Sequence, residues 1–240
     1  MRIGLLQTGD APEELQEEYG NYSDMFVRLL SGKPHDFEFS LYRVLDNQFP
    51  DSADECDGWL ITGSRFSAYG TQPWIPALKT LIQQIIASER PLIGICFGHQ
   101  IIAEALGGKV EKSDKGWGLG LDTYRIDTAL VGDKHTQLTL NIFHQDQIAQ
   151  LPPGAKVFAS SDFCEYAGML VGEQIMTIQA HPEFEKKFNR QLLQARKTTV
   201  IPEDLADQAI VVLRDEKTHT DSARFGEQMA EFFISHHRAS

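Results

Sequence analysis

Short apolar runs alternate with stretches of helical periodicity over the first two fifths of the chain. The runs predict buried strands over residues 2–7, 37–44, 59–61 and 92–95. Apolar residues spaced by three or four predict helices between them, over residues 12–30, 78–86 and 99–106. We expect Gly32 and Pro34 to end the first helix, and Gly107 and Gly108 to end the third. Strands that alternate with helices in this way indicate a parallel sheet covered on both faces.

The central part of the chain, residues 117–179, has little helical periodicity. Its apolar runs are typical of strands, at residues 120–126, 157–159, 169–171 and 174–179. We expect these strands to extend the sheet or to form an antiparallel edge. After Pro182 the pattern is helical again. Its last apolar stripe predicts a helix that faces the core, through Phe225, Met229, Phe232 and Phe233.

No internal repeat and no linker-like segment divides the 240 residues. A chain of this length can bury a core without disulfides or a metal ion. We therefore predict a single α/β domain over residues 1–240, with a mostly parallel open sheet and helices on both faces. The core is expected within residues 1–185, with extra strands at one edge, and a helical C-terminal region within residues 186–240.

Charge and cysteine usage narrow the class of protein. The net charge of −12 disfavours binding to nucleic acid or to an anionic membrane surface. The longest apolar run, residues 92–98, is far shorter than the ~18 residues of a membrane span, and residues 3–6 are too short a run for a signal peptide. Cys56, Cys96 and Cys164 fit neither a disulfide framework nor a zinc ribbon. We expect a cytoplasmic protein with reduced thiols and no bound metal or cofactor.

A candidate nucleophile stands where the strand at residues 92–95 passes into a helix. Cys96 lies there between Gly94 and Gly98, and a nucleophile between two glycines at such a turn is typical of a nucleophile elbow. The glycines let neighbouring backbone pass close, and the helix N-terminus favours the thiolate. The backbone N–H of Phe97 is placed to bind an oxyanion. The alternative is that Cys96 is only a small side chain of the core.

A candidate base follows another predicted strand, at residues 174–179. His181 stands at the carboxyl end of this strand, where open α/β sheets build their sites. Glu183 lies two residues further on, across the turn that Pro182 imposes, and can orient the imidazole. The alternative is an exposed turn in which both side chains are solvated.

With these two blocks the sequence resembles the class I (triad-type) glutamine amidotransferases. The resemblance covers roughly residues 1–185 and rests on Gly-Ile-Cys-Phe-Gly-His-Gln at residues 94–100 and His-Pro-Glu at residues 181–183. A third block, Ile-Thr-Gly-Ser at residues 61–64, stands where the family has a second oxyanion loop. The family implies a flavodoxin-like sheet.

The resemblance also implies the roles of five residues. Cys96 would be the nucleophile that attacks the side-chain amide of glutamine, and His181 the base and then the acid. Glu183 would orient His181. The backbone N–H groups of Gly63 and Phe97 would form the oxyanion hole.

The family's pocket implies a further set of residues that bind the substrate. Gln100, one helical turn after the nucleophile, matches the position that holds the amino-acid end of the substrate, and residues 143–146 resemble the His-x-Asp loop of the same pocket. The implied substrate-binding residues are Ser64, Gln100, His144, Gln145 and Asp146. For His144 the alternative is a loop histidine that only holds the backbone.

The oxyanion loop departs from part of the family. Many members linked to a synthetase carry Gly-Gly-Pro there, whereas residues 63–69 of this chain read Gly-Ser-Arg-Phe-Ser-Ala-Tyr. The loop is more similar to the stand-alone branch that resembles GMP-synthase glutaminase domains, to which plant γ-glutamyl peptidases belong. We therefore expect glutamine or a γ-glutamyl compound as the acyl donor, and the loop leaves open a leaving group larger than ammonia.

Four functions are compatible with these residues. The hypothesis we favour is hydrolysis of a γ-glutamyl amide of a small molecule through a thioester on Cys96. Because 240 residues leave no room for a synthase domain, a second hypothesis is a subunit that passes ammonia to a synthase partner. A third is a non-catalytic regulatory binding protein on the same fold. A fourth, a cysteine protease on a related fold, is disfavoured by the late His181-Pro182-Glu183 block.

Two other features are predicted to have no part in the chemistry. Cys56 and Cys164 have no base pattern beside them. A basic cluster is interpreted as a solvated helix face, and it consists of Lys186, Lys187, Arg190, Arg196 and Lys197.

Overall fold

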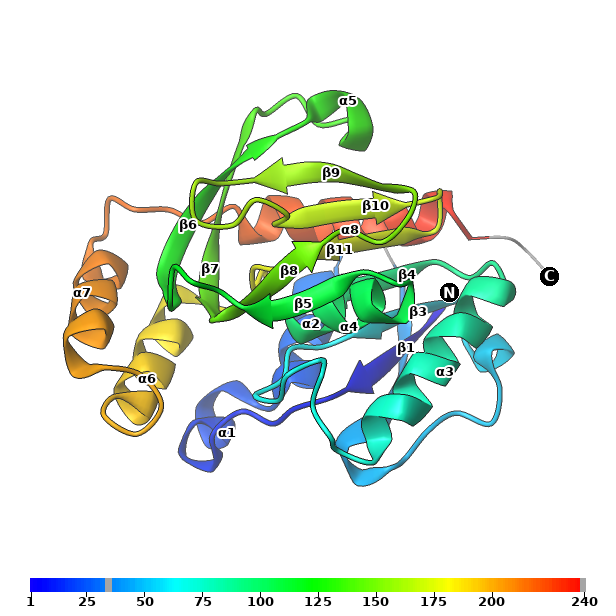
Figure 1. The fold of residues 1–240 in the computed structure, drawn as a ribbon, viewed down its shortest axis with the longest axis horizontal. Helices are drawn as coiled ribbons and strands as arrows, with labels where there is room; N and C mark the ends of the chain where they lie inside the picture. Colours follow the sequence, from blue (N-terminus) through cyan, green and yellow to red (C-terminus); the bar gives the residue numbers. More distant parts are fainter. Residues whose placement is uncertain (33–35, 238–240) are drawn as a thin grey trace.

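The computed structural model describes residues 1–32 and 36–237, and these form a nine-stranded sheet with helices on both sides (Figure 1). The strand order is β2-β1-β3-β4-β11-β10-β9-β6-β7. The five strands from β2 to β11 are parallel. They are β1 (Arg2–Gln7), β2 (Glu38–Arg43), β3 (Gly58–Ile61), β4 (Leu92–Ile95) and β11 (Ile175–Ile178). The carboxyl ends of β3, β4 and β11 therefore meet at one edge.

The other four strands are antiparallel to their neighbours and extend the sheet beyond β11. They are β6 (Gly118–Ile126), β7 (Gln137–His144), β9 (Ala155–Ser160) and β10 (Gly168–Val171). A separate antiparallel pair is formed by β5 (Lys109–Lys112) and β8 (Asp146–Gln150). The predicted α/β fold with an antiparallel extension is confirmed, while β5, β7 and β8 are strands that the apolar pattern did not indicate.

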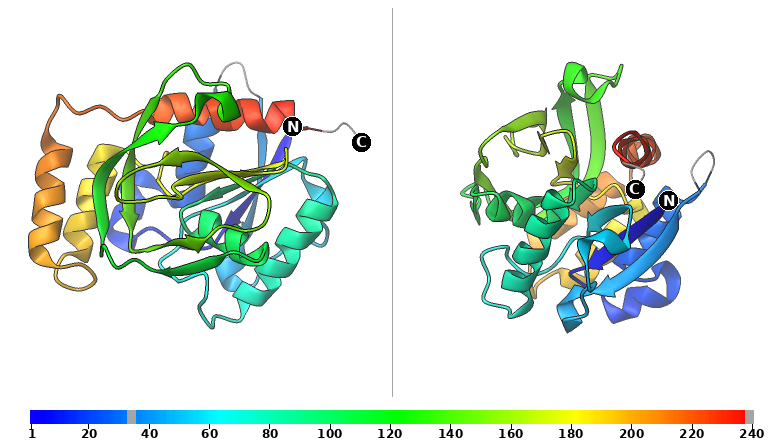
Figure 2. Two further views of the ribbon diagram at one scale, coloured as in Figure 1. Left: turned by 45° about the horizontal axis from the view of Figure 1, so that its top comes forward. Right: turned by 90° about the vertical axis from the view of Figure 1, so that its right-hand side faces the viewer.

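Two groups of helices cover opposite faces of the parallel strands (Figure 2). On one face lie α3 (Trp74–Ala87) and α4 (Phe97–Ala105), and on the other α2 (Tyr22–Leu30) and α8 (Ser222–Ser235). Adjacent strand residues serve the two faces: Leu5 packs with Phe26 and Phe233, whereas Leu6 packs in the cluster that contains Leu78. This alternation is the two-residue period of a strand covered on both sides.

The remaining helices are shorter or lie at the ends of the sheet. They are α1 (Glu13–Tyr19), α5 (Thr128–Val131), α6 (Lys186–Arg196), α7 (Glu203–Arg214) and the 3₁₀ helices Val44–Asp46 and Ala53–Glu55. The predicted helical C-terminal region is thus present as α6, α7 and α8; its last residues, 238–240, lie outside the described residues. None of the described helices is long and apolar enough to cross a membrane.

The single helix predicted over residues 12–30 is wrong. Gly20 adopts a positive φ of 70° and ends α1, and Asn21 then caps α2 by accepting a hydrogen bond from the backbone N–H of Tyr22. The Asp24 carboxylate accepts the N–H of Asn21 in return, at 2.7 Å. Glycine and a capping box override the apolar spacing that runs through both helices. Pro34, predicted to help end the helix, lies outside the described residues.

Candidate active site

Cys96 lies at the turn between β4 and α4 in a backbone conformation that few residues adopt. Its φ is +52° and its ψ −102°, so the turn is strained. Its N–H donates to Ile178 O in β11 at 2.8 Å, which ties the turn to the sheet. A Cβ on Gly94 would lie 2.6 Å from Gly98 O, and a Cβ on Gly98 would overlap Ile61 O. The turn thus has the strained geometry expected of the predicted elbow, and a side chain at either glycine would clash with neighbouring backbone.

His181 and Glu183 form a buried hydrogen-bonded pair beside this turn. Nδ1 of His181 donates to Oε1 of Glu183 at 2.7 Å, and the two residues are 4% and 6% exposed. The solvated turn that was the alternative is therefore wrong. The Cys96 thiol lies near the same ring, close enough to raise the pKa of His181. The thiol, the imidazole and the carboxylate thus lie next to one another in this order.

The surroundings of His181 favour its protonated form. Burial of the ring lowers the pKa of His181, but the negative charges of Glu183 and Cys96, with the hydrogen bonds to both, raise it to about 10. The imidazole thus keeps its proton at neutral pH. A protonated imidazole beside a cysteine stabilises the thiolate, which is the nucleophilic form.

An aromatic side chain fixes the plane of the His181 ring. Phe184 stacks on it with centroids 4.0 Å apart and an interplanar angle of 6°. Phe184 in turn contacts Phe188 edge to face at 4.7 Å, and Tyr22 at 5.8 Å. The ring is therefore held by packing as well as by Glu183.

Two buried asparagines hold the backbone around His181, and sequence reasoning did not identify them. The N–H of His181 donates to Asn141 O at 2.8 Å, and the Asn141 side chain donates to Phe184 O at 2.7 Å. Asn189 of α6 donates to the Asn141 side chain at 3.1 Å and to Gly120 O at 2.9 Å. Both asparagines are fully buried. Nothing near them in sequence marks them as partners of a histidine turn.

The loop after β3 approaches both reactive side chains. A Cβ on Gly63 would lie 2.8 Å from Cε1 of His181 and 3.8 Å from Cβ of Cys96. The Thr8 hydroxyl donates to Thr62 O at 2.9 Å. The Ser64 hydroxyl donates to Thr8 O at 2.7 Å and accepts the N–H of Phe66 at 3.2 Å. Ser64 therefore holds the loop against the end of β1.

Phe97 is the first residue of α4, directly after Cys96. A backbone N–H at this helix position has no partner inside its own helix. The ring of Phe97 is buried against Trp74, with centroids 5.6 Å apart. The first turn of α4 thus holds a backbone donor beside the thiol that its own helix does not use.

The turn between β7 and β8 forms a further wall. The Gln100 amide donates to Asp146 O at 2.9 Å and to the Gln179 side chain at 3.0 Å. The Asp146 carboxylate accepts the Ser67 hydroxyl at 2.6 Å. Nδ1 of His144 donates to Asp146 O at 3.2 Å, and burial lowers the pKa of His144 to about 4, so the ring is neutral. This contact is the one expected of a histidine that holds the backbone.

These walls enclose a cavity of about 450 Å³ above Cys96. Seven of the predicted residues line it: Ser64, Cys96, Gln100, His144, Gln145, Asp146 and His181. Gly63, Phe97 and Glu183 lie behind this surface. Tyr22, Trp117 and Arg196 also line it, although none of them was among the predicted site residues.

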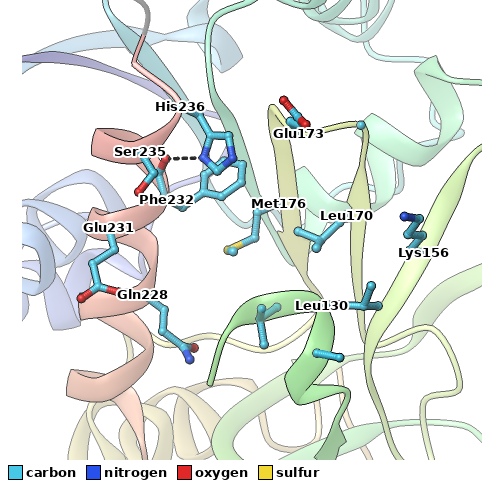
Figure 3. Close-up of a pocket in the computed structure, with 13 residues that line it drawn as sticks. Leu130, Lys156, Leu170, Glu173, Met176, Gln228, Glu231, Phe232, Ser235 and His236 are labelled. Atoms are coloured by element: carbon cyan, nitrogen blue, oxygen red, sulfur yellow. Dashed lines mark hydrogen bonds between the residues drawn. The ribbon is translucent and has the colours of Figure 1, made fainter. Parts of the chain in front are cut away.

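A second cavity, of about 360 Å³, lies between α8, α5 and the β10–β11 hairpin (Figure 3). Leu170 and Met176 line it beside Phe232 of α8, with Lys156 and Glu231 at its rim. It lies at the start of β11, whereas His181 follows the end of that strand. It contains none of the predicted site residues. The described residues contain no cluster of three or more His, Cys, Asp or Glu side chains that could hold a metal ion.

Comparison with known families agrees with the resemblance seen in the sequence. The family model "Glutamine amidotransferase class-I" matches residues 35–198. Gamma-glutamyl peptidase 3 of Arabidopsis thaliana is 32% identical over 216 residues, which is 85% of this chain and 86% of the plant protein. A glutamine-hydrolysing GMP synthase subunit from Halobacterium salinarum is 27% identical over 173 residues, 70% of this chain and 86% of the archaeal protein.

Solved structures share the fold over the whole chain. A glutamine amidotransferase from Thermotoga maritima superposes with a TM-score of 0.73 at 18% identity, covering 100% of this chain and 99% of the other. One from Methylobacillus flagellatus gives a TM-score of 0.70 at 21% identity, covering 100% and 96%. With the family match, these findings confirm the resemblance. The chain belongs to the class-I glutamine amidotransferase family and is an enzyme of the amidotransferase and hydrolase type.

Proposed function

We propose that this chain hydrolyses the γ-glutamyl amide bond of glutamine or of a γ-glutamyl compound through a glutamyl thioester on Cys96. The observation that carries the proposal is the chain of contacts from the Cys96 thiol through His181 to Glu183, at the floor of a cavity. A nucleophile, a base and a group that orients the base are the parts that covalent amide hydrolysis requires.

In the first step the Cys96 thiolate attacks the γ-carbonyl carbon and a C–S bond forms. The negative charge on the carbonyl oxygen is bound by the N–H groups of Gly63 and Phe97. The C–N bond then breaks, and His181 gives its proton to the leaving nitrogen. Glu183 keeps the ring oriented and stabilises its positive charge.

In the second step water hydrolyses the thioester. The neutral His181 takes a proton from water as the hydroxide adds to the carbonyl carbon. The C–S bond breaks, glutamate leaves, and the thiolate and the protonated imidazole are restored. Each proton that His181 gives in the first step is thus recovered in the second.

The amino-acid end of the substrate is assigned to the wall formed by the β7–β8 turn. Asp146 offers a carboxylate to the α-ammonium group, and Gln145 and Gln100 line the same wall. Because Gln100 and His144 both bind Asp146 O, we expect them to act mainly by positioning Asp146. Ser64 contributes by holding the oxyanion loop in place.

A second function is favoured by one relative. The GMP synthase subunit from Halobacterium salinarum is matched over 86% of its own length. In this second function the chain would pass ammonia to a synthase partner. Glutamine hydrolysis by the isolated chain that no added protein stimulates would contradict it.

The proposed hydrolysis is tested by following glutamate release from glutamine and from γ-glutamyl peptides. Cys96→Ala should lower kcat/KM at least about a thousandfold, because no other group replaces the nucleophile. Cys56→Ala is the matched control, since it removes another buried thiol that does not line the cavity. Full activity of Cys96→Ala would overturn the proposal, as would an equal loss in the control.

A further inference from the structure

Arg196 is the member of the basic cluster that faces the cavity. The lysines of this cluster are engaged elsewhere: Lys186 with Asp215 O and Thr218 O, Lys187 with Glu18, and Lys197 with Glu203 and Asp207. Arg196, the last residue of α6, is half-buried and lines the cavity together with Cys96 and His181. Within residues 1–32 and 36–237 its guanidinium makes no hydrogen bond or ion pair. Arg196 therefore faces the cavity, which the predicted solvated helix face did not indicate.

Tyr22 lies beside Arg196 on the same wall. Burial raises the pKa of Tyr22, and the charges of Glu183 and Arg196 are the next strongest influences on its phenol. The phenol keeps its proton and is a hydrogen-bond donor. The Tyr22 ring packs on Phe184, which stacks on His181. Tyr22 and Arg196 therefore offer donors on the His181 side of the cavity.

The carboxylates that line the cavity already have partners of their own. The Asp10 carboxylate accepts hydrogen bonds from Nη1 and Nη2 of Arg43, at 3.0 and 3.2 Å. The Asp146 carboxylate accepts a hydrogen bond from the Ser67 hydroxyl. Arg196 thus has no counterion among the described cavity residues. A half-buried guanidinium without a partner is suited to bind a carboxylate that a ligand brings.

The direction of the reaction assigns this wall to the leaving group. His181 protonates the leaving nitrogen, so that nitrogen and its substituent lie on the His181 side. Asp146 lies instead on the β7–β8 turn, where its register partner in the β5–β8 ladder is Lys112. A leaving ammonia molecule would need no cation near His181. The cavity volume of about 450 Å³ lies within the ~300–1,000 Å³ typical of sites that hold ligands larger than an amino acid.

We infer that Arg196 and Tyr22 bind a carboxylate on the leaving amine, so that the acyl donor is a γ-glutamyl peptide with a free C-terminal carboxylate. The inference rests on the proposed function, whose reaction places the leaving group beside His181. Leu192 and Val200 line the same wall, and they favour an apolar side chain on that leaving residue.

The test compares two donors that differ only in this carboxylate, γ-glutamyl-leucine and γ-glutamyl-leucinamide. The wild-type protein should hydrolyse the acid with a kcat/KM about 10- to 100-fold higher, as expected for hydrogen bonds to a charged group. Arg196→Met should reduce this ratio to about one, and Tyr22→Phe should reduce it in part. Arg190→Met, on the same helix but outside the cavity, should keep the wild-type ratio.

The outcomes separate the subsite from the reaction. An unchanged ratio in Arg196→Met would overturn the subsite while leaving the proposed hydrolysis intact. If the wild-type protein hydrolyses no donor, the proposed hydrolysis fails, and binding still tests the subsite. In that case calorimetry on Cys96→Ala should show tighter binding of the acid than of the amide, and adding Arg196→Met should abolish the difference. Equal binding of both peptides to Cys96→Ala would overturn the subsite.

Discussion

Gly63 lies directly against His181: a Cβ at position 63 would come within 2.8 Å of Cε1 of the imidazole. The same Cβ would lie 3.8 Å from Cβ of Cys96. The loop after β3 can therefore bring its backbone N–H to the reactive thiol only if residue 63 has no side chain. Cys96, His181 and the loop after β3 thus constrain one another's positions through van der Waals contact.

Gly63→Ala should reduce activity far more than stability. The added methyl group would push the His181 ring from its stacked position on Phe184, or push the loop away from Cys96. We expect kcat/KM for a γ-glutamyl donor to fall about 100-fold or more, because small displacements of reacting groups cost that much. Steady-state kinetics and thermal unfolding of the variant check this. Wild-type kcat/KM would show that the loop does not limit the position of the base.

Glu183→Gln should move the alkaline limb of the pH profile to lower pH. In the proposed reaction His181 must be protonated to release the leaving amine, and its raised pKa of about 10 keeps it protonated through neutral pH in the wild-type protein. Removing the carboxylate charge lowers that pKa toward the ordinary value of ~6.5. When kcat/KM is measured between pH 5 and 11, its alkaline decrease should then occur at least one pH unit lower than in the wild-type protein. An alkaline limb at the same pH as in the wild-type protein would show that Glu183 does not raise the pKa of His181.

Asn189→Leu should destabilise the fold. The leucine would leave Gly120 O and the Asn141 side chain without the donor that now satisfies them. A buried acceptor left unpaired costs about 1–3 kcal/mol, so we expect a decrease of that size in the free energy of unfolding in urea. Gln194→Leu, on the exposed side of the same helix, is the control. Equal stability of the two variants would show that the asparagine pair contributes little.

His99 should make the protein less stable as the pH falls. It is fully buried, bonded to the Thr177 hydroxyl at 2.7 Å and to Tyr166 O at 3.0 Å, and burial lowers the pKa of His99 to about 3. Below pH ~6.5 the unfolded chain takes up a proton that the folded chain refuses, so the loss begins there. At pH 4 it amounts to about 3 kcal/mol. Denaturant unfolding at pH 7 and pH 4 should show a smaller decrease for His99→Gln. An equal decrease in the free energy of unfolding between pH 7 and pH 4 for the two proteins would contradict this role of His99.

The positions of Cys96 and His181 in the fold were predictable because both depend on local sequence. Cys96 stands between glycines at a strand end, and His181 follows the end of another strand, so their types and positions alone indicated where they would meet. Parallel strands bring their carboxyl ends to one edge. The topology places β4 beside β11, which brings the two residues together as expected.

The other cavity residues were hidden by patterns that have a second explanation. Tyr22 follows the helical spacing of core residues, but the break at Gly20 turns α2 so that its first residue reaches the cavity. Arg196 stands in a run of basic residues, and nothing in the run distinguishes it from its neighbours. Asn141 lies on β7, a strand that the apolar pattern did not indicate. In each case contacts between residues far apart in the sequence determine where the side chain lies. Such contacts leave no signal within a short window of sequence.

A glutamyl thioester on Cys96 is the central claim, and trapping it is the most direct test. The protein is mixed with a γ-glutamyl donor, quenched in acid during turnover, digested and examined by mass spectrometry. We predict a glutamyl group on the peptide that contains Cys96, absent from the peptides of Cys56 and Cys164 and absent when Cys96→Ala is used. Turnover of the donor by a protein that never carries a glutamyl group on Cys96 would contradict the claim.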